Sequence, residues 1–244
     1  MPERAGDRVI QDQLMRLMRA IVRDDKHGVA KLIAKEPGLA RHSISVGATR
    51  EANAEFFFDE ISHYLYAGDT PLHAAAAGYR LEIARSLLDH GADVHAANRR
   101  GAQALHYAAD GAPESPHWHP EAQAKMIAVL IGAGADPNAL DKTGVTPLHR
   151  AIRQRCAAAV DSLVQNGSAV GLKNKNGSTP LHLAVQNTGR GGTGSAEAKA
   201  LQKEIISLLL NAGANLQDRD AKGKTVRECA KSSWIRPALE GSIC

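Results

Sequence analysis

Gly68-Asp-Thr-Pro-Leu-His73 is the first of three near-identical hexapeptides, followed by Gly144-Val-Thr-Pro-Leu-His149 and Gly177-Ser-Thr-Pro-Leu-His182, that decide the fold of this chain. A further copy, Gly101-Ala-Gln-Ala-Leu-His106, lacks the Thr-Pro pair, and Gly223-Lys-Thr-Val-Arg-Glu228 keeps only Gly and Thr. The glycines of consecutive copies are 33, 43, 33 and 46 residues apart. This spacing indicates a repeat protein with a 33-residue unit, in which two units carry insertions of 10 and 13 residues.

A second landmark follows each motif and keeps the same register. It occurs as Leu87-Leu-Asp-His-Gly-Ala-Asp93, Leu130-Ile-Gly-Ala-Gly-Ala-Asp136, Leu163-Val-Gln-Asn-Gly-Ser168 and Leu209-Leu-Asn-Ala-Gly-Ala-Asn215. Two landmarks that recur together are far less probable by chance than one, so the repeat is a structural unit.

Each residue type in the unit has a mechanical role. Threonine before proline is typical of a helix start, because its hydroxyl caps a free backbone N–H and proline needs none at the first helical position. The glycine of the second landmark ends a second helix, and the Asn, Asp or Lys residues before the next motif form a β-turn finger. In the third repeat, counting from the N-terminus, Gln103-Ala104 replaces Thr-Pro, so we expect its first helix to begin less sharply.

With these motifs the sequence resembles the ankyrin repeat family over roughly residues 66–230. The resemblance implies an all-α solenoid of stacked helix-turn-helix units with β-turn fingers, about six repeats including atypical caps. It further implies that the histidines of the motif tie neighbouring fingers together by hydrogen bonds, and that a partner binds on the concave face formed by finger tips and first helices. The expected function is therefore a non-enzymatic protein–protein interaction module.

The ends and the interruptions of the period predict the domain organisation. Apolar residues at helical spacing predict an N-terminal capping repeat over residues 8–41, and residues 42–66 form an aromatic-rich insertion. Residues 67–222 hold the repeats, with insertions at 110–121 and 187–197. Residues 223–240 form a C-terminal cap in which Trp234, Ile235 and Leu239 seal the last layer.

The insertion at 42–66 concentrates aromatic residues in a chain that is only 4% aromatic, with all three phenylalanines and two of the four tyrosines. One interpretation is that it folds back to cover the first repeats. The other is that some rings are exposed as anchors for a partner, since interface hot spots favour aromatic residues. The candidate anchors are Phe57, Tyr64, Tyr66 and, in the insertion at 110–121, Trp118.

The modest net charge of +4 conceals a basic rim. Many predicted finger tips carry Lys or Arg, which we interpret either as ordinary solvated turns or as a groove for an acidic protein segment. Phosphate-driven binding of nucleic acid is the alternative, although the fingers offer no aromatic residues for base stacking. The candidate partner-binding residues are Arg99, Arg100, Lys142, Val145, Arg153, Gln154, Lys173, Lys175, Gln186 and Lys222.

Catalytic, metal and membrane signals are weak. The motif histidines recur because the fold recurs, and neither GxSxG nor HExxH occurs. His117 and His119 flank Trp118 without a second metal-binding pair, and the glycine-rich segment 187–197 lacks the P-loop lysine. We therefore expect no cofactor and no metal, and a metal-dependent enzyme is the least favoured reading. Three scattered cysteines, the absence of an apolar run of 18 residues and no recognisable secretory signal predict a cytoplasmic protein that does not enter membranes.

Overall fold

A computed structural model describes residues 5–49, 51, 54–111, 113, 118–186 and 194–240. The chain folds as two compact units, of which unit 1 comprises Met1–Ala108 with Glu114–Asp136 and unit 2 comprises Ala109–Pro113 with Pro137–Cys244. Both are built from helices, and within the described ranges no helix is long and apolar enough to cross a membrane.

Unit 1 begins with a pair of helices. Helix α1 (Ala5–Val22) buries Leu14, Leu17, Met18 and Ile21, which lie on one face of the helix. Helix α2 (Lys26–Lys35) starts at Asp25, whose carboxylate accepts a hydrogen bond from the backbone N–H of the third residue of the helix, and the 3-10 turn η1 (Pro37–Arg41) follows it. Helix α1 packs against both α2 and the first helix of the next layer.

The repeats of unit 1 supply α3 (Pro71–Ala77), α4 (Leu81–Asp89), α5 (Ala104–Ala109) and α6 (Pro120–Gly132). Helix α3 is buried along its whole length because its alanines allow α1 and α4 to approach closely. Helix α5 begins at Ala104, the position equivalent to the prolines of the other motifs. Its first turn is held by the His106 ring, whose Nδ1 accepts from the Gln103 backbone N–H at 3.2 Å.

The aromatic insertion lies on the repeats of unit 1. It contains η2 (Ala54–Phe56), β1 (Phe57–Phe58), η3 (Asp59–Ile61) and β2 (His63–Tyr64), and the two short strands pair antiparallel. Its apolar residues Ile44, Ala48 and Leu65 are buried, and the N–H of Ile44 donates to the carbonyl of Asp69 at 2.9 Å. The insertion therefore covers part of the first repeats, while its aromatic rings remain half-buried.

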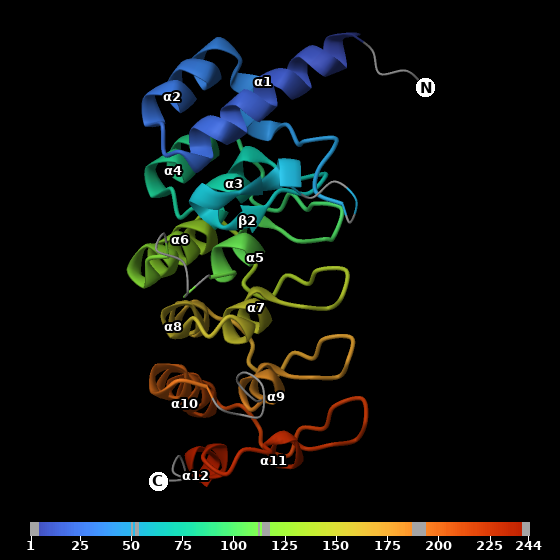
Figure 1. Cartoon of the computed structure of the whole chain (residues 1–244), viewed down its shortest axis with the longest axis vertical. Coiled ribbons are helices and arrows are strands. Elements are labelled where there is room, and N and C mark those ends of the chain that lie inside the picture. Colours follow the sequence, from blue (N-terminus) through green and yellow to red (C-terminus); the bar gives the residue numbers. More distant parts are fainter. Residues whose placement is uncertain are drawn as a thin grey trace. The chain divides into compact units, whose positions relative to one another are not determined.

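Unit 2 is a stack of three helical pairs in chain order, and all its fingers project to the same side (Figure 1). The pairs are α7 (Pro147–Arg153) with α8 (Ala157–Gln165), α9 (Pro180–Ala184) with α10 (Ala196–Asn211), and α11 (Val226–Cys229) with α12 (Ile235–Glu240). Ser195 caps α10 as its side-chain oxygen accepts from Ala198 N–H. Ile235 and Leu239 of α12 are buried, Trp234 before this helix is half-buried, and the helix packs on α10.

A threonine–histidine pair at the start of α3, α7 and α9 joins each of these helices to the finger that follows. In α7, the Thr146 hydroxyl accepts from the backbone N–H of His149, and His149 Nδ1 accepts from the backbone N–H of Thr146. Because that amide can only donate, Nδ1 carries no proton and Nε2–H donates to the carbonyl of Ser178 in the following finger at 3.1 Å. Equivalent bonds run from His73 to Ala102 O in unit 1 and from His182 to Lys224 O in unit 2.

The fingers are closed by an Asn or Asp three residues before the finger glycine. Its side-chain oxygen accepts from the backbone N–H groups two and four residues later, as Asn174 does from Asn176 at 2.9 Å and Ser178 at 3.1 Å. Asn98, Asp141 and Asp220 make the same pair of bonds in their fingers. Neighbouring tips are also joined, since Ala221 N–H donates to the carbonyl of Asn176.

Close finger stacking predicts that Gly177→Ala destabilises the protein. Gly177 has φ of +69°, and a Cβ there would lie 2.4 Å from the backbone nitrogen of Ala221. We expect the free energy of unfolding, measured in urea, to fall by about 1–3 kcal/mol. Gly171→Ala is the matched control, because a Cβ at Gly171 meets no atom within 4 Å. Equal stability of the two variants would contradict the proposed packing of the fingers.

Candidate functional site

Two sets of residues that are about forty positions apart in the sequence come together in unit 1. Arg99 and Arg100, at the tip of a finger, both lie over the ring of Tyr66 from the aromatic insertion. Their Cζ atoms are 5.6 Å and 4.9 Å from the ring centroid, which is the distance of a cation–π interaction. Arg99 also donates from its terminal nitrogen to the carbonyl of Ala48 at 2.5 Å, so the insertion and the finger hold each other.

The aromatic side of this site is a row of three rings. Phe57 and Tyr64 face each other across the β1–β2 pair, and their ring centroids are 4.7 Å apart. The ring centroids of Tyr64 and Tyr66 are 6.4 Å apart. Tilted pairs at these distances stabilise each other beyond simple burial. We call Phe57, Tyr64, Tyr66, Arg99 and Arg100 together the arginine–aromatic surface; the arginines are exposed and the rings are half-buried.

A buried polar network, which sequence reasoning missed, supports the finger of this surface. The carboxylate of Asp69 has 0% exposure and accepts hydrogen bonds from Asn98 at 2.9 Å, from the Tyr107 hydroxyl at 2.7 Å and from the Tyr66 backbone N–H at 2.6 Å. A buried carboxylate needs such partners to offset its desolvation. The one signal in the sequence is that Asp69 stands where the other motifs have Ala, Val, Ser or Lys.

The cationic residues of unit 2 lie on adjacent fingers. Lys175 N–H donates to the carbonyl of Thr143 in the preceding finger, and the same contact joins the next two fingers. Lys142, Lys175 and Lys222 are therefore carried on three consecutive tips, and we call them the lysine row. Lys173 lies beside it, with its ammonium donating to the carbonyl of Arg219 at 3.0 Å. The remaining exposed candidates of unit 2 are Arg153, Gln154 and Gln186 at the ends of α7 and α9.

Val145 does not belong to an exposed surface, and its assignment to the partner-binding residues is wrong. Its side chain is 5% exposed. The residue after the finger glycine returns to the stack, because its carbonyl closes the finger by accepting from the N–H four residues earlier, here that of Asp141. Ala102 and Ser178 hold the same position in their fingers and are also buried.

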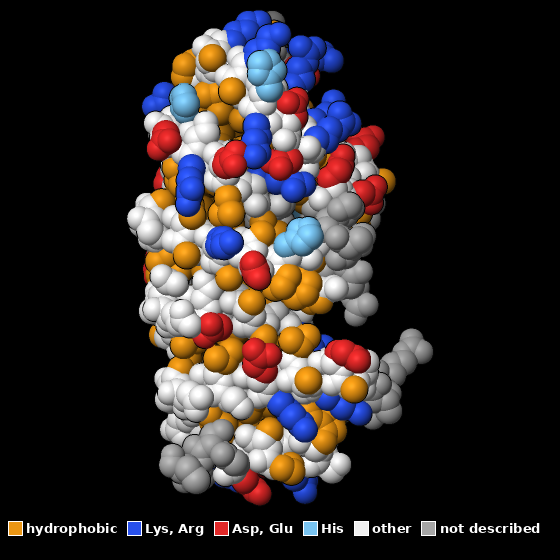
Figure 2. All heavy atoms as spheres, turned by 90° about the vertical axis from the view of Figure 1, so that its left-hand side faces the viewer, with side chains coloured by type: hydrophobic (Ala, Val, Ile, Leu, Met, Phe, Trp, Pro, Cys, Tyr) orange, Lys and Arg blue, Asp and Glu red, His pale blue; other side chains and the backbone are white. Residues whose placement is uncertain are grey.

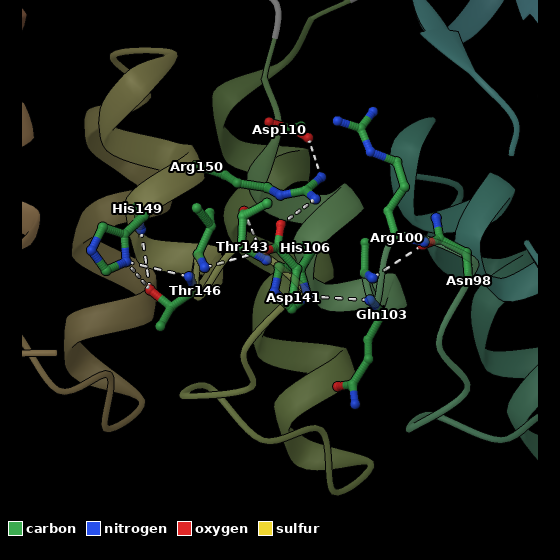
Figure 3. A network of polar contacts seen from close by, with 12 residues as sticks. Asn98, Arg100, Gln103, His106, Asp110, Asp141, Thr143, Thr146, His149 and Arg150 are labelled. Carbon is green, nitrogen blue, oxygen red and sulfur yellow. Dashed lines mark hydrogen bonds and ion pairs between the residues drawn. The ribbon is translucent and has the colours of Figure 1, made fainter. Parts of the chain in front are cut away.

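Arg150 of α7 is neutralised within unit 2 and is not free to bind a partner. Its guanidinium donates to Asp110 at 2.6 Å and to Asp141 at 3.2 Å (Figure 3). Burial opposes the charge of Arg150, but the two carboxylates outweigh it and raise the pKa of the guanidinium. Burial likewise opposes ionisation of Asp141, yet hydrogen bonds from Thr143, Val145 and Arg150 lower the pKa of that carboxyl.

Trp118 takes a structural position in unit 1. Its indole Nε1–H donates to the side-chain oxygen of Gln123 at 2.9 Å, while the Gln123 Nε2 donates to the carbonyl of Ala108. The half-buried ring therefore secures the start of α6. His117, which precedes it, lies outside the described residues, as do residues 187–193 of the glycine-rich segment.

The face of unit 1 that carries α2, α4 and α6 differs from the finger side. Figure 2 shows Lys and Arg side chains beside Asp and Glu on this face. Lys26 pairs there with Glu82 at 2.5 Å, and Arg23 lies 3.6 Å from Glu60. Mixed charges of this kind favour solubility and do not select a partner of one sign. Across the described residues, no group of three or more His, Cys, Asp or Glu side chains is placed to hold a metal ion.

Stacked helical pairs, Thr–His capping boxes and hydrogen-bonded fingers define a helical repeat protein of the ankyrin type. The family model of ankyrin repeats (3 copies) matches residues 17–115 and 119–220, so the chain belongs to the ankyrin repeat family. Repeats of this family generally mediate protein–protein interactions.

Two curated relatives are longer than this chain. A mouse protein, "Ankyrin repeat and SOCS box protein 16", is 39% identical over 119 residues, which are 48% of this chain and 25% of that protein. An Arabidopsis thaliana protein, "E3 ubiquitin-protein ligase KEG", is 27% identical over 190 residues, which are 66% of this chain and 11% of that protein. This chain thus spans only a minor part of either relative.

The Arg150 network predicts different effects of two similar substitutions. Asp141→Asn keeps the finger bonds, since asparagine makes them at Asn98 and Asn174, but it leaves a buried guanidinium with one carboxylate instead of two. We expect the free energy of unfolding to fall by about 1–3 kcal/mol. Asp220→Asn, in a finger without such an arginine partner in the described structure, should stay within about 0.5 kcal/mol. A similar loss of stability in both variants would show that the ion pair of Arg150 with Asp141 does not stabilise the fold.

Proposed function

We propose that this chain binds an acidic segment of a partner protein, and that the arginine–aromatic surface of unit 1 is its principal contact. The supporting observation is that two exposed arginines lie over one tyrosine beside two further rings. Tyrosine and arginine are the residues that most often dominate the energetics of protein interfaces.

The geometry of the arginines suits carboxylates. A guanidinium that lies over a ring keeps its N–H groups directed outward around its edge, where a carboxylate can accept two of them. The ring and, for Arg99, the carbonyl of Ala48 limit the motion of the side chains before binding. Less conformational entropy is then lost when a partner binds than for free arginines.

The lysine row of unit 2 contributes in a different way. Its three side chains are exposed and flexible, so individual contacts are weak and screened by salt. A row of one sign nevertheless attracts acidic segments and repels basic ones during encounter. We therefore assign steering to the lysine row and specificity to the arginine–aromatic surface. The scattered cysteines further support a reducing compartment such as the cytoplasm.

Charge reversal tests the proposed function. The double variant Arg99→Glu/Arg100→Glu should lose at least about tenfold in capture of the partner from a nuclease-treated native lysate, because like charges now face an acidic segment. Arg85→Glu/Lys125→Glu reverses the same charge on exposed residues of α4 and α6 in the same unit and should capture as well as the parent. Quantitative mass spectrometry compares the captured proteins. Equal capture by both double variants would reject this surface.

The ring of Tyr66 gives a second, finer test. Tyr66→Phe keeps the aromatic face under the arginines, whereas Tyr66→Leu removes it. The affinity of the captured partner, measured by calorimetry, should be nearly unchanged in the first variant and about 2–5-fold weaker in the second. An equal loss of affinity in both variants would instead assign the contact to the tyrosine hydroxyl.

A further inference from the structure

Unit 2 contains a small pocket that the proposed function does not use. Its volume is about 230 Å³, below the size of pockets for drug-sized ligands and comparable with a single large side chain. Ile152, Leu183 and Ile205 form apolar parts of its wall, and α7, α9 and α10 with the α7–α8 turn all contribute. Arg153 and Gln186 lie at its rim as exposed side chains.

Two polar atoms of this pocket have no hydrogen-bond partner among the described residues. Gln202 is 2% exposed, and its Nε2 donates to the carbonyls of Ala184 and Gln186, but its Oε1 accepts nothing. Arg155, in the α7–α8 turn, has an Nε that is likewise buried and unpaired. Buried polar atoms are rarely left without a partner, because the loss of their hydrogen bonds to water is then not compensated. The pocket therefore offers one acceptor and one cationic donor.

The same chain shows how this acceptor is satisfied elsewhere. Gln123 and Gln202 occupy the same position in their repeats, each eleven residues before the glycine that ends its second helix, Gly134 or Gly213. Both donate from Nε2 to the equivalent alanine carbonyl of the first helix. In unit 1, however, the glutamine oxygen receives the indole N–H of Trp118.

Among the described residues of unit 2, none donates a hydrogen bond to the Gln202 oxygen. The residue five positions before Gln202, equivalent to Trp118, is Glu197, an exposed residue in the first turn of α10. Its carboxylate is directed to that turn, because hydrogen bonds with its own backbone N–H and with Ser195 lower its pKa. The two repeats thus share the glutamine and differ in whether the chain itself supplies an indole.

We infer that the pocket of unit 2 binds a tryptophan side chain from an acidic segment of the partner protein, with the indole N–H donating to Gln202 Oε1. This inference rests on the proposed function for the nature of the partner. Ile152, Leu183 and Ile205 provide apolar contacts for the ring, and Gln186 and Arg153 lie at the rim as exposed side chains. Burial lowers the pKa of the Arg155 guanidinium, as expected for a cation without a counter-charge, and an acidic residue beside the tryptophan supplies one.

Synthetic peptides on the full chain test the indole contact directly. The probe is a dye-labelled pentapeptide with Trp between two pairs of Glu and Asp, and its counterpart carries 1-methyltryptophan, which has the same ring without the N–H. Fluorescence anisotropy should show binding of the first peptide at least about tenfold tighter than the second, since the methylated ring leaves Oε1 unpaired. Equal affinities, or no binding of either peptide at millimolar concentration, would overturn the inference.

Variants assign the effect to this pocket. Gln202→Leu should bind both peptides equally and weakly, whereas Lys203→Ala, an exposed neighbour on α10, should keep the tenfold preference. Preference retained in a folded Gln202→Leu protein contradicts the inference. The Arg99→Glu/Arg100→Glu protein, altered only in unit 1, should also keep the preference. Failure of the lysate capture therefore rejects the proposed function by itself, and failure of the methyl discrimination rejects this pocket.

Discussion

The structure depends on one small constellation, the threonine and histidine at the starts of α3, α7 and α9. The histidine ring accepts a backbone N–H on one side and donates to the next finger on the other, so a single buried side chain both begins a helix and joins two repeats. In His149 this arrangement requires a neutral ring with its proton on Nε2. Burial disfavours the charged form and lowers the pKa of His149 below its usual 6.5. Protonation of the ring would remove its Nδ1 acceptor and break the hydrogen bond from the Thr146 backbone N–H, whereas Nε2–H could still donate to Ser178.

The functional surfaces follow from this constraint. Because each finger is tied to its neighbour and closed by an Asn or Asp at its base, the tips are rigid supports rather than loose turns. Rigid tips allow Arg99 and Arg100 to lie over Tyr66. The acidic residues at the bases of the fingers are engaged within the protein. Asp220 is occupied by backbone N–H groups, which lower its pKa, and Asp141 is held by its finger and Arg150.

The sequence predicted the structural features that recur with the repeat. Helices that start at Thr-Pro, helices that end at glycine, and histidines that link the fingers all recur along the chain. Each copy of the motif therefore supports the structural interpretation of the others. Features that occur once could not be predicted in this way. Three such features join residues that are distant in the sequence and meet only in the folded chain. They are the hydrogen bonds of Asp69, the contact of Arg99 with the insertion and the ion pairs of Arg150. The prediction that Val145 is exposed was wrong for a related reason. Its position in the finger suggested an exposed tip, but its carbonyl accepts from the Asp141 N–H and the residue is buried. The Asn or Asp three residues before each finger glycine indicates a turn in the sequence, but its pair of hydrogen bonds to the finger backbone is seen only in the structure.

The most direct test of the account is the protonation state of His149, measured by imidazole ¹⁵N NMR across a pH series. The account predicts a proton on Nε2 and none on Nδ1 at neutral pH, with titration clearly below pH 6.5. Since the pKa is lowered in the folded chain, the stability due to this ring is complete above pH 6.5 and is lost as the pH falls toward the folded value. A proton on Nδ1, or titration at the ordinary histidine pKa, would contradict the claim that this ring joins the layers.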